Sequence, residues 1–441
     1  MENNFNLIII GGGPGGYKTA TYAASKGLSV LLVEKDELGG TCLNRGCIPT
    51  KTYARNAEIL HDLKSSAVFG LDNLSFSLNL KTVVERKKSV VETLRNGIPT
   101  LLSVPGIAVI KGEARLQTAC SIIVDGEEYT ADNIIIATGS KPKTLSLEEM
   151  DSRMICDSTW LLDTENFPKR ICIVGAGVIG MEFASILNLF GCDVMVVEYL
   201  KECLPSLDAD IAKRLRKSME KRGVTFYMQS ALKSVADGKI LIEKKGKEIE
   251  LEADKVLLAV GRMPDIDTRS LDSLGVKYDR RGIAVDENMQ TTVPHLYAVG
   301  DVNGRQMLAH AAEMQGKRAV NNILGTADTI RFDIMPAAIF TLPEAACVGK
   351  TEEQLKTEGA EFSCEKHFYR SNGKAMAMNE TEGMLKLLAD STGRIVGCHV
   401  YGAHAADLVQ EVSALMCRNT TLAQLSDIIH IHPTLSEIIT E

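Results

Sequence analysis

The sequence predicts an α/β fold in which two dinucleotide-binding units are followed by a separate α+β domain. Three observations lead to this prediction. A pattern of strand, glycine loop and helix occurs twice, two cysteines separated by four residues stand just after the first copy, and the sequence changes character after about residue 331. The length of 441 residues is sufficient for several domains, because a single hydrophobic core stops growing at about 250 to 300 residues.

The first copy of the pattern lies near the N-terminus. An apolar strand at residues 6–10 leads into Gly11-Gly12-Gly13-Pro14-Gly15-Gly16, a helix ends at Gly27, and a second strand at 30–33 closes with Glu34. In such a fingerprint the first glycine makes a tight turn, the second lets the backbone approach a pyrophosphate, and the third allows close helix packing. The helix N-terminus faces the negative charge, and the final acid binds a ribose. We therefore predict a dinucleotide site that includes Gly11, Gly13, Pro14, Gly16 and Glu34.

The second copy repeats this order of elements. A strand at 171–174 leads into Gly175-Ala176-Gly177-Val178-Ile179-Gly180, a helix ends at Gly191, and a strand at 194–197 closes with Glu198. In both copies the acid stands 23 residues after the first glycine. A carboxylate hydrogen-bonds a free ribose 2′-hydroxyl but repels the 2′-phosphate of NADP, so Glu198 favours NAD. The second dinucleotide site is predicted at Gly175, Gly177, Gly180 and Glu198.

Further strands and helices complete the predicted domains. Residues 141–170 are interpreted as a connecting segment, because they contain two prolines and many charged residues. A strand at 296–301 and a helix follow, and after residue 331 strands and helices alternate as in an α+β domain. Both copies also continue in a meander of strands, predicted at 121–124, 127–130 and 134–139 in the first copy and at 240–242, 248–251 and 256–261 in the second.

Composition excludes several classes of protein. The chain has 49 basic and 57 acidic residues, a net charge of −8 and no basic tract, so nucleic acid and anionic membranes are poor partners. Its apolar runs are far shorter than the roughly 18 residues needed to span a bilayer, and no signal peptide is recognisable. Eleven scattered cysteines, an odd number, do not resemble a disulfide framework. We expect a soluble, cytoplasmic protein without a structural metal site.

The cysteine pair is Cys42 and Cys47. In a regular helix, Cα atoms five residues apart are roughly 8 to 9 Å from one another, beyond the roughly 7 Å that a disulfide tolerates. Cys42 is therefore predicted in a turn, which Gly46 permits. Pro49 fits the first turn of a helix, so Cys47 is predicted near a helix N-terminus that stabilises its thiolate. A redox dithiol and a buried, inert pair both remain open, whereas zinc sites usually need two further ligands.

These motifs together resemble the pyridine nucleotide-disulfide oxidoreductase family over the whole chain. The stretch Asn44-Arg45-Gly46-Cys47-Ile48-Pro49-Thr50-Lys51 is most similar to the dihydrolipoamide dehydrogenases. The resemblance implies two Rossmann-like dinucleotide-binding domains, the first for FAD and the second for NAD, with a C-terminal α+β dimerisation domain. The implied boundaries are 1–140 and 263–330 for the two parts of the FAD-binding domain, 141–262 for the NAD-binding domain and 331–441 for the dimerisation domain.

The resemblance also implies roles for single residues. Cys42 exchanges with substrate sulfur, and Cys47 contacts the flavin. Lys51 lies by the reactive nitrogen of the flavin, paired with Glu182; the alternatives are a helix-surface charge and a helix-start acid. Further cofactor contacts are expected at Thr138, Gly139, Gly261, Gly300, Asp301, Met307, Leu308, Ala309 and His310.

A base is expected near the C-terminus. A dithiol must lose protons when it reduces a disulfide, so the reaction needs a group that titrates near neutrality. By resemblance this base is His432, and Glu437 orients it. The alternative for Glu437 is a capping role, because Thr434 and Glu437 have capping-box spacing. His430 is expected to be structural.

The activity implied by the resemblance is oxidation of protein-bound dihydrolipoamide to lipoamide by a homodimer, with FAD as relay and NAD⁺ reduced to NADH. The lipoyl group would belong to another protein, either the acyltransferase of a 2-oxoacid dehydrogenase complex or the lipoyl carrier of glycine cleavage.

Two alternative functions remain. One is an NAD(P)H-dependent reductase of another disulfide or a metal ion, similar to glutathione or mercuric reductases. The other is a non-catalytic nucleotide-binding redox sensor.

Overall fold

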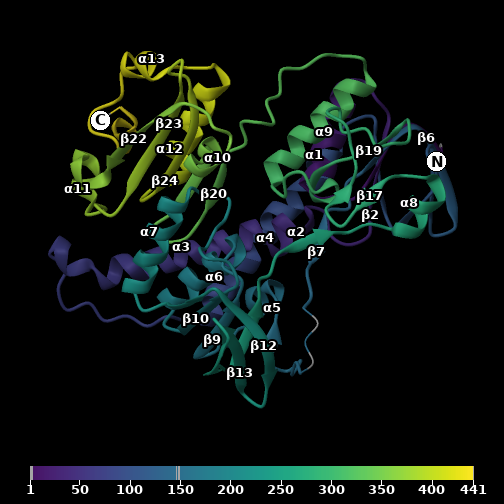
Figure 1. Cartoon of the computed structure of the whole chain (residues 1–441). Coiled ribbons are helices and arrows are strands. Elements are labelled where there is room, and N and C mark those ends of the chain that lie inside the picture. Colours follow the sequence, from purple (N-terminus) through teal and green to yellow (C-terminus); the bar gives the residue numbers. More distant parts are fainter. Residues whose placement is uncertain (1–2, 146, 148, 441) are drawn as a thin grey trace. The chain divides into compact units, whose positions relative to one another are not determined.

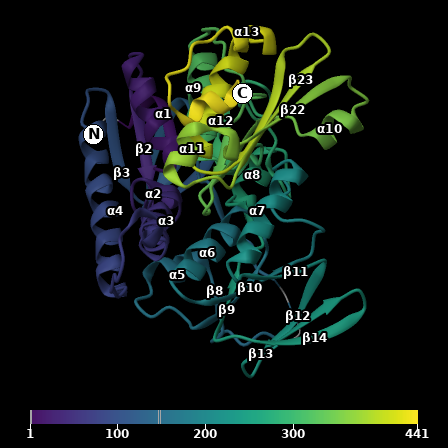
Figure 2. The same cartoon turned by 90° about the vertical axis from the view of Figure 1, so that its left-hand side faces the viewer.

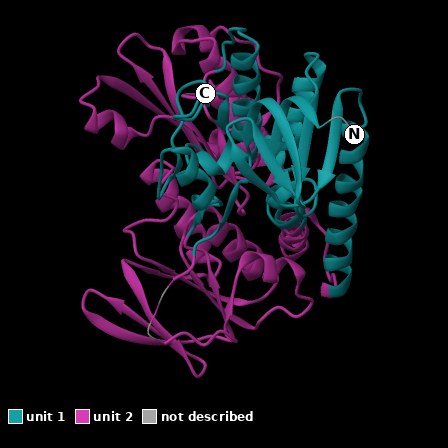
Figure 3. Cartoon of the chain, turned by 90° about the vertical axis from the view of Figure 1, so that its right-hand side faces the viewer, with its two compact units in different colours: residues 1–52, 81–143, 261–330 teal, residues 53–80, 144–260, 331–441 magenta. Residues whose placement is uncertain are grey.

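The computed structural model describes residues 3–145, 147 and 149–440 (Figure 1). The chain forms two compact units, each assembled from separated segments (Figure 3). Unit 1 comprises residues 1–52, 81–143 and 261–330, and unit 2 comprises residues 53–80, 144–260 and 331–441. None of the helices formed by the described residues has both the length and the apolar character needed to cross a membrane.

Unit 1 is built on a mixed seven-stranded sheet of order β3-β2-β1-β6-β5-β4, with β19 paired to β6. Strands β3, β2 and β1 pair in parallel, and the later residues of β6 pair in parallel with both β1 and β19. Residues Leu7 to Ile10 of β1 are nearly inaccessible. A continuous apolar run is typical of a parallel strand covered on both faces. The strands are β1 (Asn4–Ile10), β2 (Val30–Glu34), β3 (Ile107–Lys111), β4 (Ala114–Thr118), β5 (Ser121–Val124), β6 (Glu127–Ile136) and β19 (Leu296–Ala298).

Strand β6 differs from the prediction. Two strands were expected at 127–130 and 134–139, but Glu127–Ile136 is one continuous strand. Its first four residues pair with β5 in antiparallel orientation, and its later residues pair in parallel with β1 and β19. The strand therefore changes partners without ending, and its polar residues near the middle mark that change.

The helices of unit 1 cover the sheet and position its loops. Helix α1 (Pro14–Ser25) packs on β2 and against α9 (Ala309–Ile323), as Figure 2 shows for α1 and β2. Gly316 of α9 permits the close helix contact, because a Cβ there would lie 1.7 Å from Thr19 Oγ1. The other helices that lie wholly in unit 1 are α2 (Gly40–Arg45), α8 (Thr268–Leu274) and the 3₁₀ turn η2 (Gly300–Asn303). Two helices cross the unit boundaries, α3 (Cys47–Lys64) and α4 (Leu80–Leu102).

Unit 2 contains a second parallel sheet, of order β11-β10-β9-β15-β8. Strand β8 lies in the segment interpreted as a connection, and it pairs with β15. That segment also forms the short helix α5 (Ser158–Asp163), so it is partly structural. The strands are β8 (Ile155–Cys156), β9 (Arg170–Val174), β10 (Asp193–Glu198), β11 (Thr225–Met228) and β15 (Lys255–Leu258), and the associated helices are α6 (Val178–Leu189) and α7 (Ala209–Lys221). The predicted meander is β12 (Ser230–Ala236), β13 (Lys239–Lys244) and β14 (Lys247–Glu252).

The C-terminal part of unit 2 is an antiparallel sheet of order β20-β21-β24-β23-β22. Helix α12 (Ala405–Cys417) packs on this sheet (Figure 2). The strands are β20 (Ala337–Ile339), β21 (Ala345–Gly349), β22 (Phe362–Phe368), β23 (Met384–Asp390) and β24 (Ile395–Tyr401). The remaining helices are α10 (Glu352–Thr357), α11 (Gly373–Met378), α13 (Leu422–Ser426) and the 3₁₀ turn η4 (Leu435–Ile439).

Replacing Gly316 with alanine is expected to destabilise unit 1 by about 1 to 3 kcal/mol, the usual cost of overpacking a close contact. The added methyl group would push α9 away from Thr19 of α1. Urea unfolding followed by flavin fluorescence measures the effect. Thr19→Ala in the same chain should restore part of the lost stability, and an unchanged midpoint in Gly316→Ala would contradict the proposed helix contact.

Candidate active site

The two cysteines lie at the junction of two helices. The prediction of a turn at Cys42 is wrong, because Cys42 lies in α2; the break falls after it, at Gly46, with φ −144° and ψ −108°. A Cβ on Gly46 would lie 2.9 Å from the carbonyl oxygen of Thr41, so this sharp change of direction favours glycine. Cys47 is the first residue of α3, and Pro49 lies in its first turn as predicted. The break, rather than a turn at Cys42, brings the thiols together.

The thiols of Cys42 and Cys47 influence one another. Cys42 is half-buried, Cys47 is exposed, and no disulfide joins them. A hydrogen bond with Cys47 and burial raise the pKa of the Cys42 thiol, and the positive charge of Lys51 opposes this rise. The stabilised thiolate predicted for Cys47 remains a prediction. The arrangement is that of a reduced dithiol close enough to interact directly.

The first glycine loop has the geometry expected of a nucleotide cradle. Gly11 has φ +108°, and a Cβ there would lie 2.4 Å from the carbonyl oxygen of Ala137. A Cβ on Gly16 would lie 1.7 Å from the carbonyl oxygen of Gly11. The carboxylate of Glu34 accepts hydrogen bonds from the Gly12 N–H at 2.5 Å and the Asp36 N–H at 2.7 Å. The acid is thus held beside the loop.

The second glycine loop repeats these contacts almost atom for atom. Gly175 has φ +104°, and its Cβ would lie 2.5 Å from the carbonyl oxygen of Ala259. The carboxylate of Glu198 accepts hydrogen bonds from the Ala176 N–H at 2.6 Å and the Leu200 N–H at 2.7 Å. A Cβ on Gly177 would meet no atom within 4 Å, which leaves room for a pyrophosphate. Both loops therefore fit a dinucleotide.

Asp301 lies in a small polar network near the predicted flavin site. Ser140 Oγ donates to Asp301 Oδ2 at 2.5 Å, and Arg262 Nε donates to Ser140 Oγ at 2.7 Å. Burial raises the pKa of Asp301, while the hydrogen bond from Ser140 and the charge of Arg262 oppose this rise. The network orients the carboxylate proposed to contact the ribityl chain.

Ser140 and Arg262 were missed from the sequence. Each directly follows a predicted contact, Gly139 in one case and Gly261 in the other. Their strands, β7 (Ser140–Pro142) and β16 (Arg262–Pro264), pair in antiparallel orientation. Each of these two residues stands next to a glycine that was predicted to bind a cofactor, and this position was the signal that could have identified it. The pairing of two segments so far apart in the chain could not be inferred from the sequence.

The remaining residues predicted to contact the flavin lie at loop and helix ends of unit 1. Thr138 and Gly139 follow β6, and the Thr138 hydroxyl donates to the carbonyl oxygen of Asp265 at 2.7 Å. Gly300 begins η2, and its N–H donates to Gln315 Oε1 at 2.8 Å. Met307 and Leu308 precede α9, while Ala309 and His310 are its first residues. The positive end of a helix dipole at such a helix start can face a negatively charged group.

Glu182 is a buried residue of α6 rather than an acid at its start. It is 4% exposed, and its Oε1 accepts a hydrogen bond from the Phe340 N–H at 2.9 Å. Ser185 Oγ accepts from the Leu342 N–H at 3.0 Å. Lys51 lies in the first turns of α3. The pairing of Lys51 with Glu182 remains a prediction.

His432 and Glu437 form the contact that a base and its orienting carboxylate require. His432 Nδ1 lies 2.8 Å from Glu437 Oε1, and the imidazole is 80% exposed. Glu437 Oε2 accepts a hydrogen bond from the Thr434 N–H at 2.8 Å. The bonds from Thr434 and from His432 lower the pKa of Glu437. Capping and orientation of His432 are therefore compatible.

Burial fixes the segment that carries this pair. Ile438 and Ile439, beside Glu437, are at most 1% exposed and join the core of the C-terminal sheet. The neighbouring His430 also has a carboxylate partner, with Nε2 lying 2.9 Å from Glu411 Oε1, but its side chain is only 8% exposed. Of the two histidines, only His432 presents an accessible ring.

Comparison with known proteins identifies the family. Residues 5–316 match the pyridine nucleotide-disulphide oxidoreductase family, and residues 335–441 match the dimerisation domain of the same family. The chain belongs to this family. The predicted fold class, the oxidoreductase activity and the use of FAD and NAD are confirmed, and the dimerisation domain supports a homodimer.

Individual relatives cover almost the whole chain. The dihydrolipoyl dehydrogenase of Chlamydia muridarum is 36% identical over 448 residues, 99% of this chain and 96% of the relative. That of Mycobacterium tuberculosis is 37% identical over 453 residues, 99% of this chain and 97% of the relative. A solved structure of the HOCl-induced flavoprotein disulfide reductase RclA from Escherichia coli has a TM-score of 0.87 and 28% identity, and the alignment covers 98% of each chain.

The two acids after the glycine loops offer a matched test of the two nucleotide sites. Glu198→Ala should weaken NADH binding roughly 10- to 100-fold, because hydrogen bonds to charged groups contribute about 1.5 to 3 kcal/mol. Its FAD content should not change, whereas Glu34→Ala should lose FAD. Fluorescence titration with NADH and flavin absorbance measure these effects. Loss of FAD from Glu198→Ala would contradict the separation of the sites.

Proposed function

We propose that this protein oxidises protein-bound dihydrolipoamide to lipoamide and reduces NAD⁺ to NADH. The observation that carries the proposal is the interacting pair Cys42 and Cys47 at the α2–α3 break, in a chain similar over 99% of its length to enzymes named dihydrolipoyl dehydrogenase. An accessible histidine held by a carboxylate supplies the base that dithiol chemistry needs.

The proposed reaction begins with the two cysteines oxidised to a disulfide. His432 Nε2, supplied across the interface of the homodimer as the family resemblance implies, accepts a proton from one substrate thiol, and the resulting thiolate attacks the sulfur of Cys42. A mixed disulfide forms and Cys47 leaves as a thiolate. The second substrate thiol releases its proton to solvent and attacks the substrate sulfur of the mixed disulfide. Lipoamide is released and Cys42 leaves as a thiolate, so two electrons now reside on the cysteine pair.

Bound FAD supplies the two-electron relay from the cysteine pair to NAD⁺. Within the chain, the glycine loops and the acids Glu34 and Glu198 are proposed to bind the two dinucleotides, and Asp301 to orient the flavin through its ribityl chain. Lys51 is proposed to lie by the reactive nitrogen of the flavin, where its charge would favour electrons, and Glu182 is proposed to fix that lysine. The net reaction gives lipoamide, NADH and one proton.

The proposed domains correspond to these separate binding roles. Residues 1–140 and 263–330 form the two parts of the FAD-binding domain, residues 141–262 bind NAD, and residues 331–441 form the interface domain. The partner is a lipoyl-bearing protein of a 2-oxoacid dehydrogenase complex or of glycine cleavage. We place the reaction in the cytoplasm, because the eleven scattered cysteines, an odd number, do not resemble the disulfide framework of a secreted protein.

A second candidate is an NAD(P)H-dependent reductase of another disulfide or of a metal ion. The similarity to RclA favours it, since solved structures of that reductase include a Cu(II) complex at 27% identity and a TM-score of 0.87. Within the described residues, no group of three or more His, Cys, Asp or Glu side chains is arranged to hold a metal ion. Under this alternative, the metal-ion substrate would bind at the cysteine pair itself.

An anaerobic titration distinguishes the two candidates. Dihydrolipoamide added to the flavin-containing protein should produce a long-wavelength thiolate-to-flavin band, and NAD⁺ should then yield stoichiometric NADH. Cys42→Ser should keep its flavin but lose this reaction. A flavin that does not respond to dihydrolipoamide, but which NADH or NADPH reduces and Cu(II) or glutathione disulfide reoxidises, would favour the second candidate.

His432→Gln separates the two half-reactions. Dithiol oxidation should slow by about 10² to 10⁴, the usual contribution of a general base, while reduction of the flavin by NADH should keep its rate. Stopped-flow absorbance measures both steps. The matched control is His404→Gln, an exposed histidine of the same C-terminal domain. Equal slowing of both half-reactions would argue against a base role for His432.

A further inference from the structure

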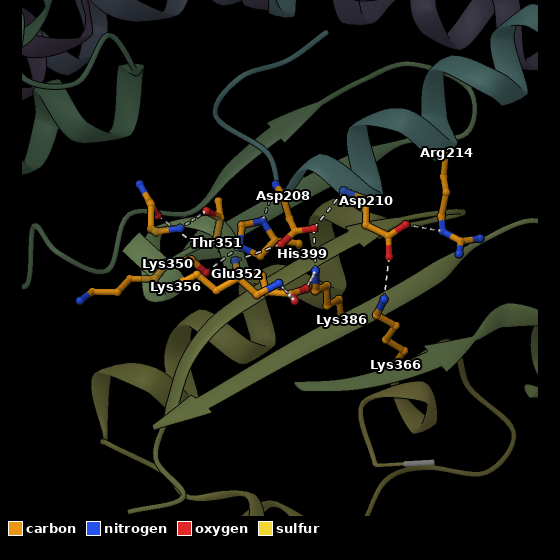
Figure 4. Close-up of polar contacts among 11 residues, drawn as sticks. Asp208, Asp210, Arg214, Lys350, Thr351, Glu352, Lys356, Lys366, Lys386 and His399 are labelled. Atoms are coloured by element: carbon orange, nitrogen blue, oxygen red, sulfur yellow. Dashed lines mark hydrogen bonds and ion pairs between the residues drawn. The ribbon is translucent and has the colours of Figure 1, made fainter. Parts of the chain in front are cut away.

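A buried ionic cluster joins the loop after β10 to the C-terminal sheet. We define the cluster as Asp208, Glu352, Lys386 and His399, all within unit 2 (Figure 4). Lys386 of β23 has a side chain that is 1% exposed, and its Nζ lies 2.7 Å from Asp208 Oδ1 and 2.5 Å from Glu352 Oε2. The side chain of Asp208 is fully inaccessible. In the folded protein, two carboxylates therefore replace the water that would otherwise solvate the ammonium group of Lys386.

Asp208 is the centre of the cluster. It caps α7, since its Oδ1 accepts from the Asp210 N–H at 3.1 Å. Its Oδ2 accepts from the Glu352 N–H at 3.1 Å, at the start of α10. Its own N–H donates to His399 Nδ1 at 3.3 Å, and His399 Nε2 donates to the carbonyl oxygen of Lys350 at 2.9 Å. Both imidazole nitrogens have assigned partners, so the ring is neutral with its proton on Nε2.

Stability alone is a weak explanation for this cluster. A buried ion pair often stabilises a fold no more than apolar side chains of similar size would, because desolvation offsets the attraction. A buried ion pair does fix the positions of its partners, because removing one partner leaves a buried charge unpaired. The residue held in place here is Asp208, whose carboxylate accepts bonds from β23 and α10 and whose backbone N–H donates to His399 of β24.

Asp208 ends a ten-residue loop that begins directly after Glu198. At the start of this loop, the Leu200 N–H donates to Glu198 Oε1 at 2.7 Å. In its middle, the Leu204 N–H donates to the carbonyl oxygen of Ala176 in the second glycine loop at 2.9 Å. Leu204 has the left-handed φ of +49° and is 1% exposed. The Leu207 N–H then donates to the Leu204 carbonyl oxygen at 2.9 Å, one residue before Asp208.

A continuous path of bonded residues thus runs from Lys386 to the glycine loop. Its strained residue, Leu204, needs restraint on both sides, because a non-glycine residue in this region costs free energy. Ala176 restrains it on the nucleotide side, and Asp208 restrains the chain beyond it. The C-terminal domain therefore fixes the far end of the loop that follows the ribose-binding acid.

We propose that Lys386 and Asp208 are positioning residues for the pyridine nucleotide: through the buried ionic cluster, they hold the loop 199–208 in the conformation that binds the adenosine end of NAD. Neither residue needs to touch the nucleotide. The inference rests on the assignment of Glu198 to the NAD ribose in the proposed function. It makes NAD affinity depend on a strand of the dimerisation domain.

A second ion pair between the C-terminal sheet and the start of α7 supplies a matched control. Lys366 of β22 pairs with Asp210 of α7 at 2.7 Å, but these side chains are 39% and 29% exposed. The pair joins the sheet to α7 beyond the loop, and exposed pairs contribute little. Lys366→Met removes a lysine from a neighbouring strand without unpairing Asp208.

The test uses the full-length, FAD-containing protein. Lys386→Met should raise about tenfold the NADH concentration that half-saturates flavin reduction in anaerobic stopped-flow absorbance, while FAD content and flavin reduction by dihydrolipoamide stay at wild-type values. Lys366→Met should bind NADH within about twofold of wild type. If Lys386→Met does not fold, Asp208→Asn keeps a good helix cap and should weaken NADH binding in the same direction.

Two outcomes would overturn the inference. One is wild-type NADH affinity in a folded Lys386→Met or Asp208→Asn variant. The other is a parallel loss of NADH binding, FAD and dithiol reactivity, which a general loss of stability produces. Failure of the proposed function is separable, because a wild-type protein that responds to NADH but not to dihydrolipoamide still allows the comparison of NADH affinity with FAD content in the variants.

Discussion

Both nucleotide sites depend on one steric constraint, the close approach of a glycine to a neighbouring strand end. Gly11 and Gly175 follow the first strand of each copy, and a side chain on either would collide with a carbonyl oxygen 2.4 or 2.5 Å from the Cβ position. Because these glycines turn the chain sharply, the N-terminus of the next helix points into the space above the strands. Glu34 and Glu198, at the ends of the second strands, then accept hydrogen bonds from backbone N–H groups of these loops.

The duplication extends to single hydrogen bonds. Gly11 donates to Val33 and Gly175 donates to Val197, each at 2.8 Å. This near identity means that the glycine loops themselves do not distinguish FAD from NAD. The distinction therefore comes from what surrounds them. The proposed contributors are the cysteine helices and η2 in unit 1, and the loop 199–208 with its attachment to the C-terminal sheet in unit 2.

The sequence was most informative where function depends on neighbouring residues. The two glycine loops, the helix start at Cys47 and the capping spacing of Glu437 were all visible, because each is set by contacts over a few positions. Cys42 was misplaced because a break at Gly46 can end one helix and start another without an intervening turn. Strand β6 was divided because its polar residues resemble a strand end, although only its partner changes.

Contacts between distant segments were not visible. Lys386 lies 178 positions from Asp208, and its surroundings in the sequence are those of an ordinary strand lysine. Ser140 and Arg262 lie 122 positions apart and meet only because β7 and β16 pair. No periodicity or motif encodes such meetings, since they depend on how whole strands pack.

The contact between His432 and Glu437 depends on a short stretch of the chain, unlike the contacts between distant segments. Five positions separate the two residues, and the Thr434 cap lies between them. The loop closed by their contact is very short, so its formation costs little chain entropy once the adjoining isoleucines are anchored. Alignment of the imidazole is therefore a local property that the C-terminal segment carries with it, and sequence drift elsewhere in the domain can proceed without disturbing it.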